Sequence, residues 1–328
     1  FLFIFMIILF NSPIRFTSNK KFSFTILPKN LLTILPYFLL IFIFILFAGL
    51  FGFNLNFNIF NFFSQELYAR RSDFQIQQNA SGFIGNYVVG NVHNVLMPFL
   101  IGYSIQYKKI LLFILSLLLY IYVFLITSYK MIFFAPILLI GSYFLIFKSE
   151  SSLKSFPVTF LKYISMLFIF FFIADFILQY PAFNTLLTRR LFFMPVLIGS
   201  NYYDFFTVNG FTFFSDIRFF SDLFIFPFSD NLPDTIGRYY FEEGNHANTN
   251  FLADSLTKFG VLSAVIYIVF LRILLELMDF LAKDKNIFII YSIAIIPLFT
   301  LTNSALTTTL LSHGLVASII LITLIREN

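Results

Sequence analysis

The sequence predicts an all-α, polytopic membrane protein, and three observations support this fold class. First, 59% of the 328 residues are hydrophobic and only 11% are charged, a composition outside the range of soluble globular domains. Second, apolar runs of roughly 17 to 23 residues recur, each long enough for a helix to cross a hydrocarbon core of about 30 Å. Third, the short alternating segments of membrane β-barrels are missing from the sequence. We therefore expect a helix bundle of about nine spans with one large outer loop.

The expected spans follow one another along the whole chain. The chain starts inside an apolar run, Phe1 to Phe10, which we interpret as the tail of a spanning helix in a chain truncated at its N-terminus. Further spans are expected at residues 31–53, 82–105, 110–126, 131–147, 163–180, 256–277, 287–302 and 307–325. Together they make a single membrane domain, residues 1–328, in which residues 181–255 are the large outer loop.

Basic residues indicate how the chain is oriented. The segment from Asn11 to Asn30 has four basic residues and no acidic one, which is typical of a cytoplasmic segment. Crossing from there puts residues 54–80, a tight turn at Thr127–Lys130 and the large loop on the outer side. Six arginines of the two longer outer loops are not needed for orientation and are candidates for function: Arg70, Arg71, Arg189, Arg190, Arg218 and Arg238. The net charge of +5 thus reflects membrane orientation, and no nucleic-acid partner is expected.

Signatures of soluble catalysis are missing from the sequence. It has no phosphate-binding glycine loop, no His-Glu-x-x-His and no Gly-x-Ser-x-Gly, and it has no cysteine and three histidines. We expect no metal and no cofactor. Because an Asp-x-Asp cluster is also missing, a diphosphate ligand would have to be neutralised by arginine.

Two pairs of adjacent arginines suit that task, Arg189–Arg190 and Arg70–Arg71. Arginine binds phosphate oxygens through two parallel N–H groups and stays charged at any working pH. Neighbouring residues of a helix point about 100° apart, so one arginine of each pair would face a ligand. The alternative is that both pairs are interfacial anchors that snorkel at the end of a span.

His246 is the strongest candidate for proton transfer. It lies in a polar run directly before an expected helix, for which Asn248 or Thr249 would be the N-cap. A helix N-terminus attracts an anionic phosphate, and a histidine beside it can accept the proton of a sugar hydroxyl as a general base. A solvated loop histidine without a chemical role is the alternative.

Other polar residues in or near the spans have simpler interpretations. His93 is expected to pack in the bundle with a hydrogen bond to Asn91, Asn94 or another helix, or else to line the site. Asp175 is a secondary candidate near the outer end of its span. Arg272 and Glu276 are four residues apart, which predicts a structural ion pair. The repeated Phe-Phe-Ser-Asp at 213–216 and 219–222 predicts an interfacial helix or turn, or is low-complexity drift.

Several short motifs, in this order and in these places, resemble the Wzy-type O-antigen and capsule repeat-unit polymerases. They are Tyr68-Ala-Arg-Arg71, Thr127-Ser-Tyr-Lys130, Arg189-Arg-Leu-Phe-Phe-Met-Pro195, Tyr202-Tyr-Asp-Phe-Phe206, and Ala247-Asn-Thr-Asn-Phe-Leu-Ala-Asp254 followed by Phe259-Gly260. The resemblance covers roughly residues 66 to 262. Each motif is short and degenerate, so their order and placement carry the resemblance.

The resemblance implies a glycosyltransferase of the bacterial cytoplasmic membrane with its active site facing the periplasm or cell exterior. Such an enzyme moves a glycan chain from undecaprenyl diphosphate onto a new lipid-linked repeat unit, beside a flippase and a chain-length regulator. It further implies that Arg189 or Arg190, helped by Arg71, holds the diphosphate and that His246 activates the acceptor. Tyr202, Tyr203, Asp204, Asn245 and Asn248 would contact the substrate.

Three alternatives share part of this pattern. An O-antigen ligase uses the same donor and also has a large outer loop. A lipid-linked oligosaccharide flippase would spread polar residues through its spans, and a non-catalytic assembly protein would tolerate the loss of Arg190 and His246.

Overall fold

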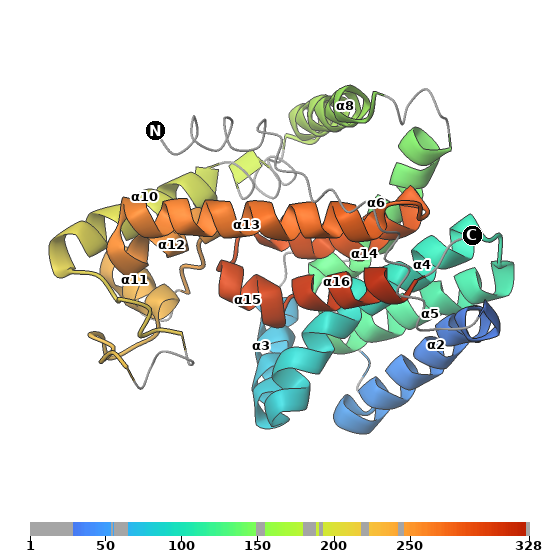
Figure 1. The fold of residues 1–328 in the computed structure, drawn as a ribbon, viewed down its shortest axis with the longest axis horizontal. Coiled ribbons are helices and arrows are strands. Elements are labelled where there is room, and N and C mark those ends of the chain that lie inside the picture. Colours follow the sequence, from blue (N-terminus) through green and yellow to red (C-terminus); the bar gives the residue numbers. More distant parts are fainter. Residues whose placement is uncertain are drawn as a thin grey trace. The chain divides into compact units, whose positions relative to one another are not determined.

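The computed structural model describes residues 29–53, 55, 65–148, 155–179, 188–189, 193–217, 223–241 and 246–325. Every regular element in these ranges is a helix (Figure 1). The predicted all-α class is thereby confirmed, and the helices are consistent with a polytopic bundle.

Seven helices of the described ranges are long and apolar enough to cross a membrane. They are Thr33–Phe51, Ile84–Gln106, Ile110–Thr127, Lys130–Phe147, Val158–Ile177, Val261–Ala282 and Leu306–Leu324. Each corresponds to one predicted span. The span expected at 287–302 is a shorter apolar helix, Ile287–Thr300, and Phe1–Phe10 lies outside the described residues.

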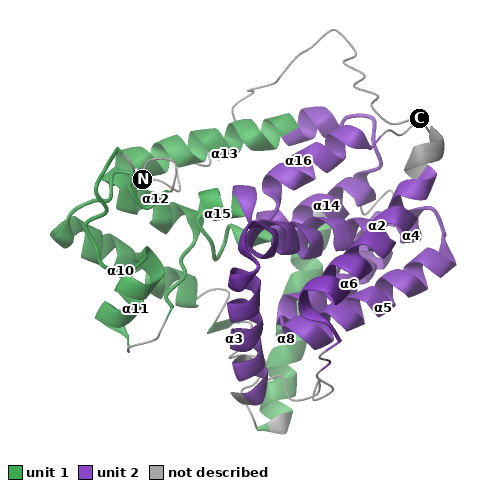
Figure 2. Ribbon diagram, turned by 90° about the horizontal axis from the view of Figure 1, so that it is seen from below, with its two compact units in different colours: residues 1–17, 157–277, 299–309 green, residues 18–156, 278–298, 310–328 purple. Residues whose placement is uncertain are grey.

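The chain divides into two compact units, which Figure 2 shows in green and purple. Unit 1 comprises residues 1–17, 157–277 and 299–309, and unit 2 comprises residues 18–156, 278–298 and 310–328. Unit 2 contains α2 (Lys29–Phe51), α3 (Gln65–Ala80), η1 (Ile84–Val89), η2 (Val92–Leu96), α4 (Met97–Gln106), α5 (Ile110–Thr127), α6 (Lys130–Ser142), η3 (Tyr143–Phe147), α14 (Ile287–Thr300) up to residue 298, and α16 (Leu315–Leu324).

Helix α5 is central to unit 2, because α2, α4 and α6 all pack against it. The tight turn predicted after α5 is confirmed: the helix ends at Thr127, Ser128 takes a left-handed φ of 55°, and α6 begins at Lys130. Part of the expected outer loop at 54–80 is instead the polar helix α3. Its buried Phe74 packs edge-on against Tyr129 of the turn, with ring centroids 5.5 Å apart.

Unit 1 contains the whole of the large loop, and much of the described part of this loop is helical. The helices of unit 1 are α8 (Phe156–Leu178) from residue 157, α10 (Met194–Asn209), α11 (Leu232–Tyr240), α12 (Phe251–Phe259), α13 (Val261–Ala282) up to residue 277, and the first residues of α15 (Leu306–Leu311). Helix α10 packs along α12 and also contacts α11. A core of Ile198, Phe205, Phe206, Leu232 and Ile236 joins α10 to α11. The loop thus has an apolar core of its own.

Two predicted boundaries in this region are wrong. The span expected from Leu256 begins at Val261, because Gly260 takes a φ of +76° that only glycine adopts readily and so separates α12 from α13. The N-cap of α12 is Asn250, and not Asn248 or Thr249. Its side-chain oxygen accepts hydrogen bonds from the backbone N–H groups of Leu252 at 3.1 Å and Ala253 at 2.9 Å.

Candidate functional site

The first part of the site is the N-terminus of α11, which sets the position of Asp234. Asn231 is the N-cap, and its side-chain oxygen accepts a hydrogen bond of 3.0 Å from the Asp234 backbone N–H. Pro233 follows in the first turn, where a missing N–H is tolerated. Asn231 Nδ2 also donates to Asp234 Oδ2 at 2.7 Å. The carboxylate is therefore held at a helix N-terminus, where the dipole favours negative charge.

Asp234 is paired with His246, the histidine predicted from the sequence. The Nδ1 atom of His246 lies 2.5 Å from Oδ1 of Asp234, and the two side chains are 50% and 42% exposed. An ionised carboxylate can only accept a hydrogen bond, so Nδ1 carries the proton. In the neutral ring Nε2 is then left with its lone pair and is available to take a proton from a ligand.

Electrostatics keeps the Asp234 carboxyl in its ionised form. Partial burial acts to raise its pKa, but the hydrogen bond and charge of His246, the hydrogen bond from Asn231 and the charge of Arg238 outweigh this and hold the pKa below its usual value. Arg238 lies one helical turn further on and forms an ion pair with Asp230 at 2.8 Å. The carboxylate and the cation therefore lie on α11, and the base, His246, is brought to them by the segment that follows this helix.

Backbone contacts fix the segment that carries His246. The backbone N–H of Ala247 donates to the carbonyl of Pro233 at 3.0 Å. The Ala247 carbonyl accepts a hydrogen bond of 3.0 Å from the hydroxyl of Tyr202. Tyr202 is 1% exposed; burial, followed by the charges of Asp254, Asp216 and Asp234, raises its pKa well above the usual value. Its hydroxyl therefore stays protonated and holds the histidine segment against α10.

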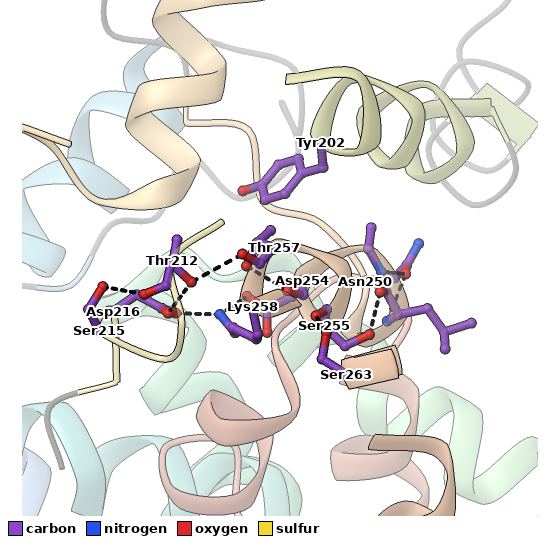
Figure 3. Close-up of polar contacts among 12 residues, drawn as sticks. Tyr202, Thr212, Ser215, Asp216, Asn250, Asp254, Ser255, Thr257, Lys258 and Ser263 are labelled. Atoms are coloured by element: carbon purple, nitrogen blue, oxygen red, sulfur yellow. Dashed lines mark hydrogen bonds and ion pairs between the residues drawn. The ribbon is translucent and has the colours of Figure 1, made fainter. Parts of the chain in front are cut away.

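The same unit also contains a buried cluster of charged side chains on α12 and the turn after α10 (Figure 3). Lys258 is 1% exposed and forms ion pairs with Asp216 and Asp254; its distance to Asp254 Oδ1 is 3.2 Å. Asp254 lies one turn before Lys258 on α12, whereas Asp216 comes from the turn. We call these three residues the buried cluster.

The turn after α10, residues 210–217, is fastened to α12 by this cluster, and we call it the strap. The backbone N–H groups of Thr212 and Phe213 donate to the carbonyls of Thr257 and Lys258 at 2.8 and 2.9 Å. The hydroxyl of Thr212 donates to Asp216 Oδ1 at 3.0 Å. Phe213 and Phe214 have φ angles of 49° and 67°, which are unfavourable for residues with a β-carbon. Contacts with α12 therefore hold a strained backbone in place.

Two predicted substrate contacts, Tyr203 and Asp204, lie on the exposed side of α10, and Tyr203 is 50% exposed. Asn248 is also exposed. Tyr202 faces the core, so it is not available to a ligand from solution. Arg189 is exposed. Arg190 and Asn245 lie outside the described residues.

Arg71 belongs to unit 2, whereas the His246 segment belongs to unit 1. Its guanidinium lies over the ring of Tyr129, 5.1 Å from the centroid, in a cation–π contact. Burial raises the pKa of Tyr129, partly offset by the charge of Arg71 and by hydrogen bonds from Gln75 and Arg71. Arg71 forms no carboxylate ion pair among the described residues.

The polar residues of the spans that were considered above bond mostly to partners on their own helix. Nδ1 of His93 donates to the carbonyl of Val89 in its own helix at 2.8 Å, so its partner is not Asn91 or Asn94. Arg272 and Glu276 form the predicted ion pair. In the Phe-Phe-Ser-Asp repeat, the first copy is the turn of the strap, and residues 219–222 are outside the described ranges.

A hollow of about 170 Å³ lies between α10, α12 and the start of α13. Its lining is largely apolar: Tyr203, Phe206, Thr207, Phe211, Leu256, Gly260 and Val261. The described residues contain no group of three or more histidine, cysteine or acidic side chains that could hold a metal ion.

Asp234 and the buried cluster were not predicted as site residues. For Asp234 a signal existed, because Asn-Leu-Pro-Asp at 231–234 has the pattern of a capped helix start. Lys258 and Asp254 are spaced i, i+4, but their burial with Asp216 depends on tertiary packing. No protein-family model matches the sequence, and no curated protein or solved structure is significantly similar to it.

Proposed function

We propose that this protein is a membrane glycosyltransferase of the repeat-unit polymerase type. It would transfer a glycan from undecaprenyl diphosphate onto a new lipid-linked repeat unit at the outer face of a bacterial cytoplasmic membrane. The observation that carries the proposal is the exposed His246–Asp234 pair at 2.5 Å, in the segment where the sequence resembles that family. A base oriented by a carboxylate is what activation of a hydroxyl requires.

In the proposed reaction, Nε2 of His246 accepts the proton of an acceptor sugar hydroxyl. The oxygen then forms a bond to the anomeric carbon of the donor glycan. The bond from that carbon to the diphosphate oxygen breaks, and its electron pair leaves with undecaprenyl diphosphate. Asp234 keeps the proton on Nδ1 and stabilises the imidazolium that forms. The imidazolium then returns its proton to solvent or to the leaving group.

Cations would stabilise the charge that develops on the diphosphate. Arg189 and Arg190 remain the residues that the resemblance implies for this task. Arg238 is added because it lies one helical turn from Asp234 and its side chain is 56% exposed. The apolar hollow beside Tyr203 suits the hydrocarbon part of a lipid-linked substrate better than its sugars.

Complementation of a polymerase-deficient strain with the complete gene tests the proposal, with the surface-glycan ladder as readout. We expect His246→Ala to leave a single repeat unit on the core, a loss of roughly 10²- to 10⁴-fold in transfer rate. Asp234→Asn should lower the rate less. The exposed Lys283 is outside the proposed site, so Lys283→Met controls for expression and membrane insertion.

Three other results of this experiment would overturn the proposal. Loss of all core-attached glycan in the deletion strain, restored by the gene, would indicate a ligase. A normal ladder from inserted His246→Ala protein would exclude the histidine as the base. Lipid-linked units that accumulate on the cytoplasmic side would indicate a flippase.

A further inference from the structure

The buried cluster contains one more acidic group than basic groups. Two carboxylates, Asp216 and Asp254, face the single ammonium of Lys258. If both were ionised, the cluster would carry a net negative charge in a place where Lys258 is 1% and the Asp254 side chain 8% exposed. An uncompensated charge is very unfavourable in such surroundings. A neutral cluster needs one additional proton.

The two carboxylates differ in their hydrogen bonds. Both oxygens of Asp216 have donors, because Oδ2 accepts from Lys258 and Oδ1 accepts from the Thr212 hydroxyl at 3.0 Å. Asp254 has one contact, from Oδ1 to Lys258 at 3.2 Å. Its Oδ2 is buried without a hydrogen-bond partner in the described part of the chain. The surroundings of Asp216 suit a carboxylate, and those of Asp254 suit a carboxylic acid.

The groups around Asp254 come from four elements. Lys258 is on the same helix, Asp216 is on the strap, Tyr202 is on α10 and Tyr267 is on α13. The charges of Lys258 and Asp216 act on Asp254. The charges of Asp254 and Asp216 act on the hydroxyls of the two tyrosines. The Tyr267 hydroxyl is also buried without a partner among the described residues. None of the four is a second cation. The missing positive charge is therefore not supplied by another side chain of this group.

We propose that Asp254 is a proton-binding site: at neutral pH it holds a proton on Oδ2, and the strap closes on α12 in the resulting neutral state of the cluster. Lys258 then pairs fully with Asp216. Burial, which is partly offset by Lys258 and reinforced by Asp216, raises the pKa of Asp254 in agreement with this assignment. The inference goes beyond the proposed glycosyl transfer and does not depend on it.

The proton on Asp254 affects how firmly the strap is held against α12. The strained backbone at Phe213 and Phe214 is held by Asp216 on Lys258 and by the ring of Phe214, which stacks on Tyr267 at 6.4 Å. When Asp254 loses its proton, it competes with Asp216 for the same ammonium. Because the pKa of Asp254 is raised in the folded state, its contribution to folding stability is present at low pH and is lost as the pH rises through the folded-state pKa. The strap should therefore loosen toward alkaline pH.

Thermal unfolding of the full chain in detergent micelles tests the protonation state. Asparagine resembles a protonated aspartate, so Asp254→Asn should keep the wild-type melting temperature at neutral pH and remove its decline at higher pH. Asp216→Asn should lower the melting temperature at neutral pH, because Lys258 loses its main partner while Asp254 still holds its proton. If Asp254→Asn is as damaging as Asp216→Asn, or if Asp216→Asn has no effect, the proposal is overturned.

Labelling of the strap gives a second readout. The chain has no cysteine, and Ser215 of the strap is 4% exposed, so Ser215→Cys is a unique probe. Its maleimide labelling should accelerate several-fold more with rising pH than in the same protein carrying Asp254→Asn, which corrects for thiol ionisation. Equal pH dependence in the two proteins would mean that the proton on Asp254 does not control the strap.

Discussion

Two groups of charged side chains in unit 1 have similar chemistry and opposite surroundings. His246 and Asp234 form a close pair whose side chains are 50% and 42% exposed. Lys258, Asp216 and Asp254 form the buried cluster, with Lys258 1% exposed. Water screens the first group, so it contributes little to stability but is open to a ligand. The second group is closed to ligands, and its charges depend on one another. Burial, and not residue type, separates the candidate for chemistry from the residues that hold the fold.

The largest expected effect comes from removing the cation of the buried cluster. Lys258→Met leaves Asp216 without its partner in a buried site, so we expect the free energy of unfolding to fall by about 3 kcal/mol. Denaturant unfolding in micelles at neutral pH measures this. Lys283→Met at an exposed position is the matched control and should change stability by less than about 0.5 kcal/mol. Similar values for the two variants would show that the cluster does not hold the fold.

The N-cap of α12, Asn250, lies in the sequence between His246 of the exposed pair and Asp254 of the buried cluster. Asn250→Ala removes the acceptor for two backbone N–H groups, and we expect it to cost about 1 kcal/mol of stability. The same unfolding measurement checks it. Asn248→Ala serves as the control, since the Asn248 side chain makes no hydrogen bond among the described residues. An equal loss in both variants would contradict the capping role of Asn250.

Tyr202 also joins the two regions, and the loss of its hydroxyl should have an effect of similar or smaller size. Tyr202→Phe leaves the Ala247 carbonyl without its donor in a buried place, which we expect to cost about 1 kcal/mol. Tyr203→Phe, at an exposed hydroxyl, should be nearly neutral in the same assay. If Tyr202 positions His246, glycan transfer should decline more than stability explains. Unchanged transfer by a destabilised Tyr202→Phe protein would limit Tyr202 to a packing role.

The smallest effect on stability is expected at the exposed pair. Asp234→Ala should cost less than about 1 kcal/mol at neutral pH, because water screens an ion pair at this exposure. The pKa of Asp234 is lowered in the folded state, so its contribution is present above the unfolded-state pKa and is lost as the pH falls through the folded-state pKa. Wild type and Asp234→Ala should thus converge in acid. A gap that widens in acid would contradict this linkage, and Asp204→Ala controls for loss of an exposed carboxylate.

Much of the fold was predictable because a spanning helix requires a continuous apolar run, which can be recognised within one segment of the sequence. Seven predicted spans have counterparts of spanning length among the described helices, and an eighth corresponds to the shorter apolar helix Ile287–Thr300. The turn at Ser128 was expected from a single short polar interruption. The errors lie where local pattern and tertiary packing disagree. Gly260 ends α12 within a run that reads as one apolar helix, and residues 65–80 form a helix although they are polar enough to read as a loop.

The candidate site was predictable only in part. The polar run before α12 pointed to His246, since a histidine at an expected helix start is a local feature. Its partner Asp234 lies twelve residues earlier, and the pair forms because Ala247 bonds to Pro233 across the loop. Tyr202 illustrates the opposite case. Its neighbours Tyr203 and Asp204 share its motif, yet the helical turn of α10 directs Tyr202 into the core and leaves the other two exposed.

The sequence by itself therefore determined the all-α class, most of the spans and the segment that contains the polar side chains of the candidate site. Hydrophobic length and helix-capping residues act over a few turns, so one chain segment carries that information alone. Tertiary structure decided which charges are paired and which are buried. The energy of a charge depends on the water and partners that distant segments bring or remove. For this reason Lys258 reads as one more basic residue in the sequence and is a buried ion pair in the fold.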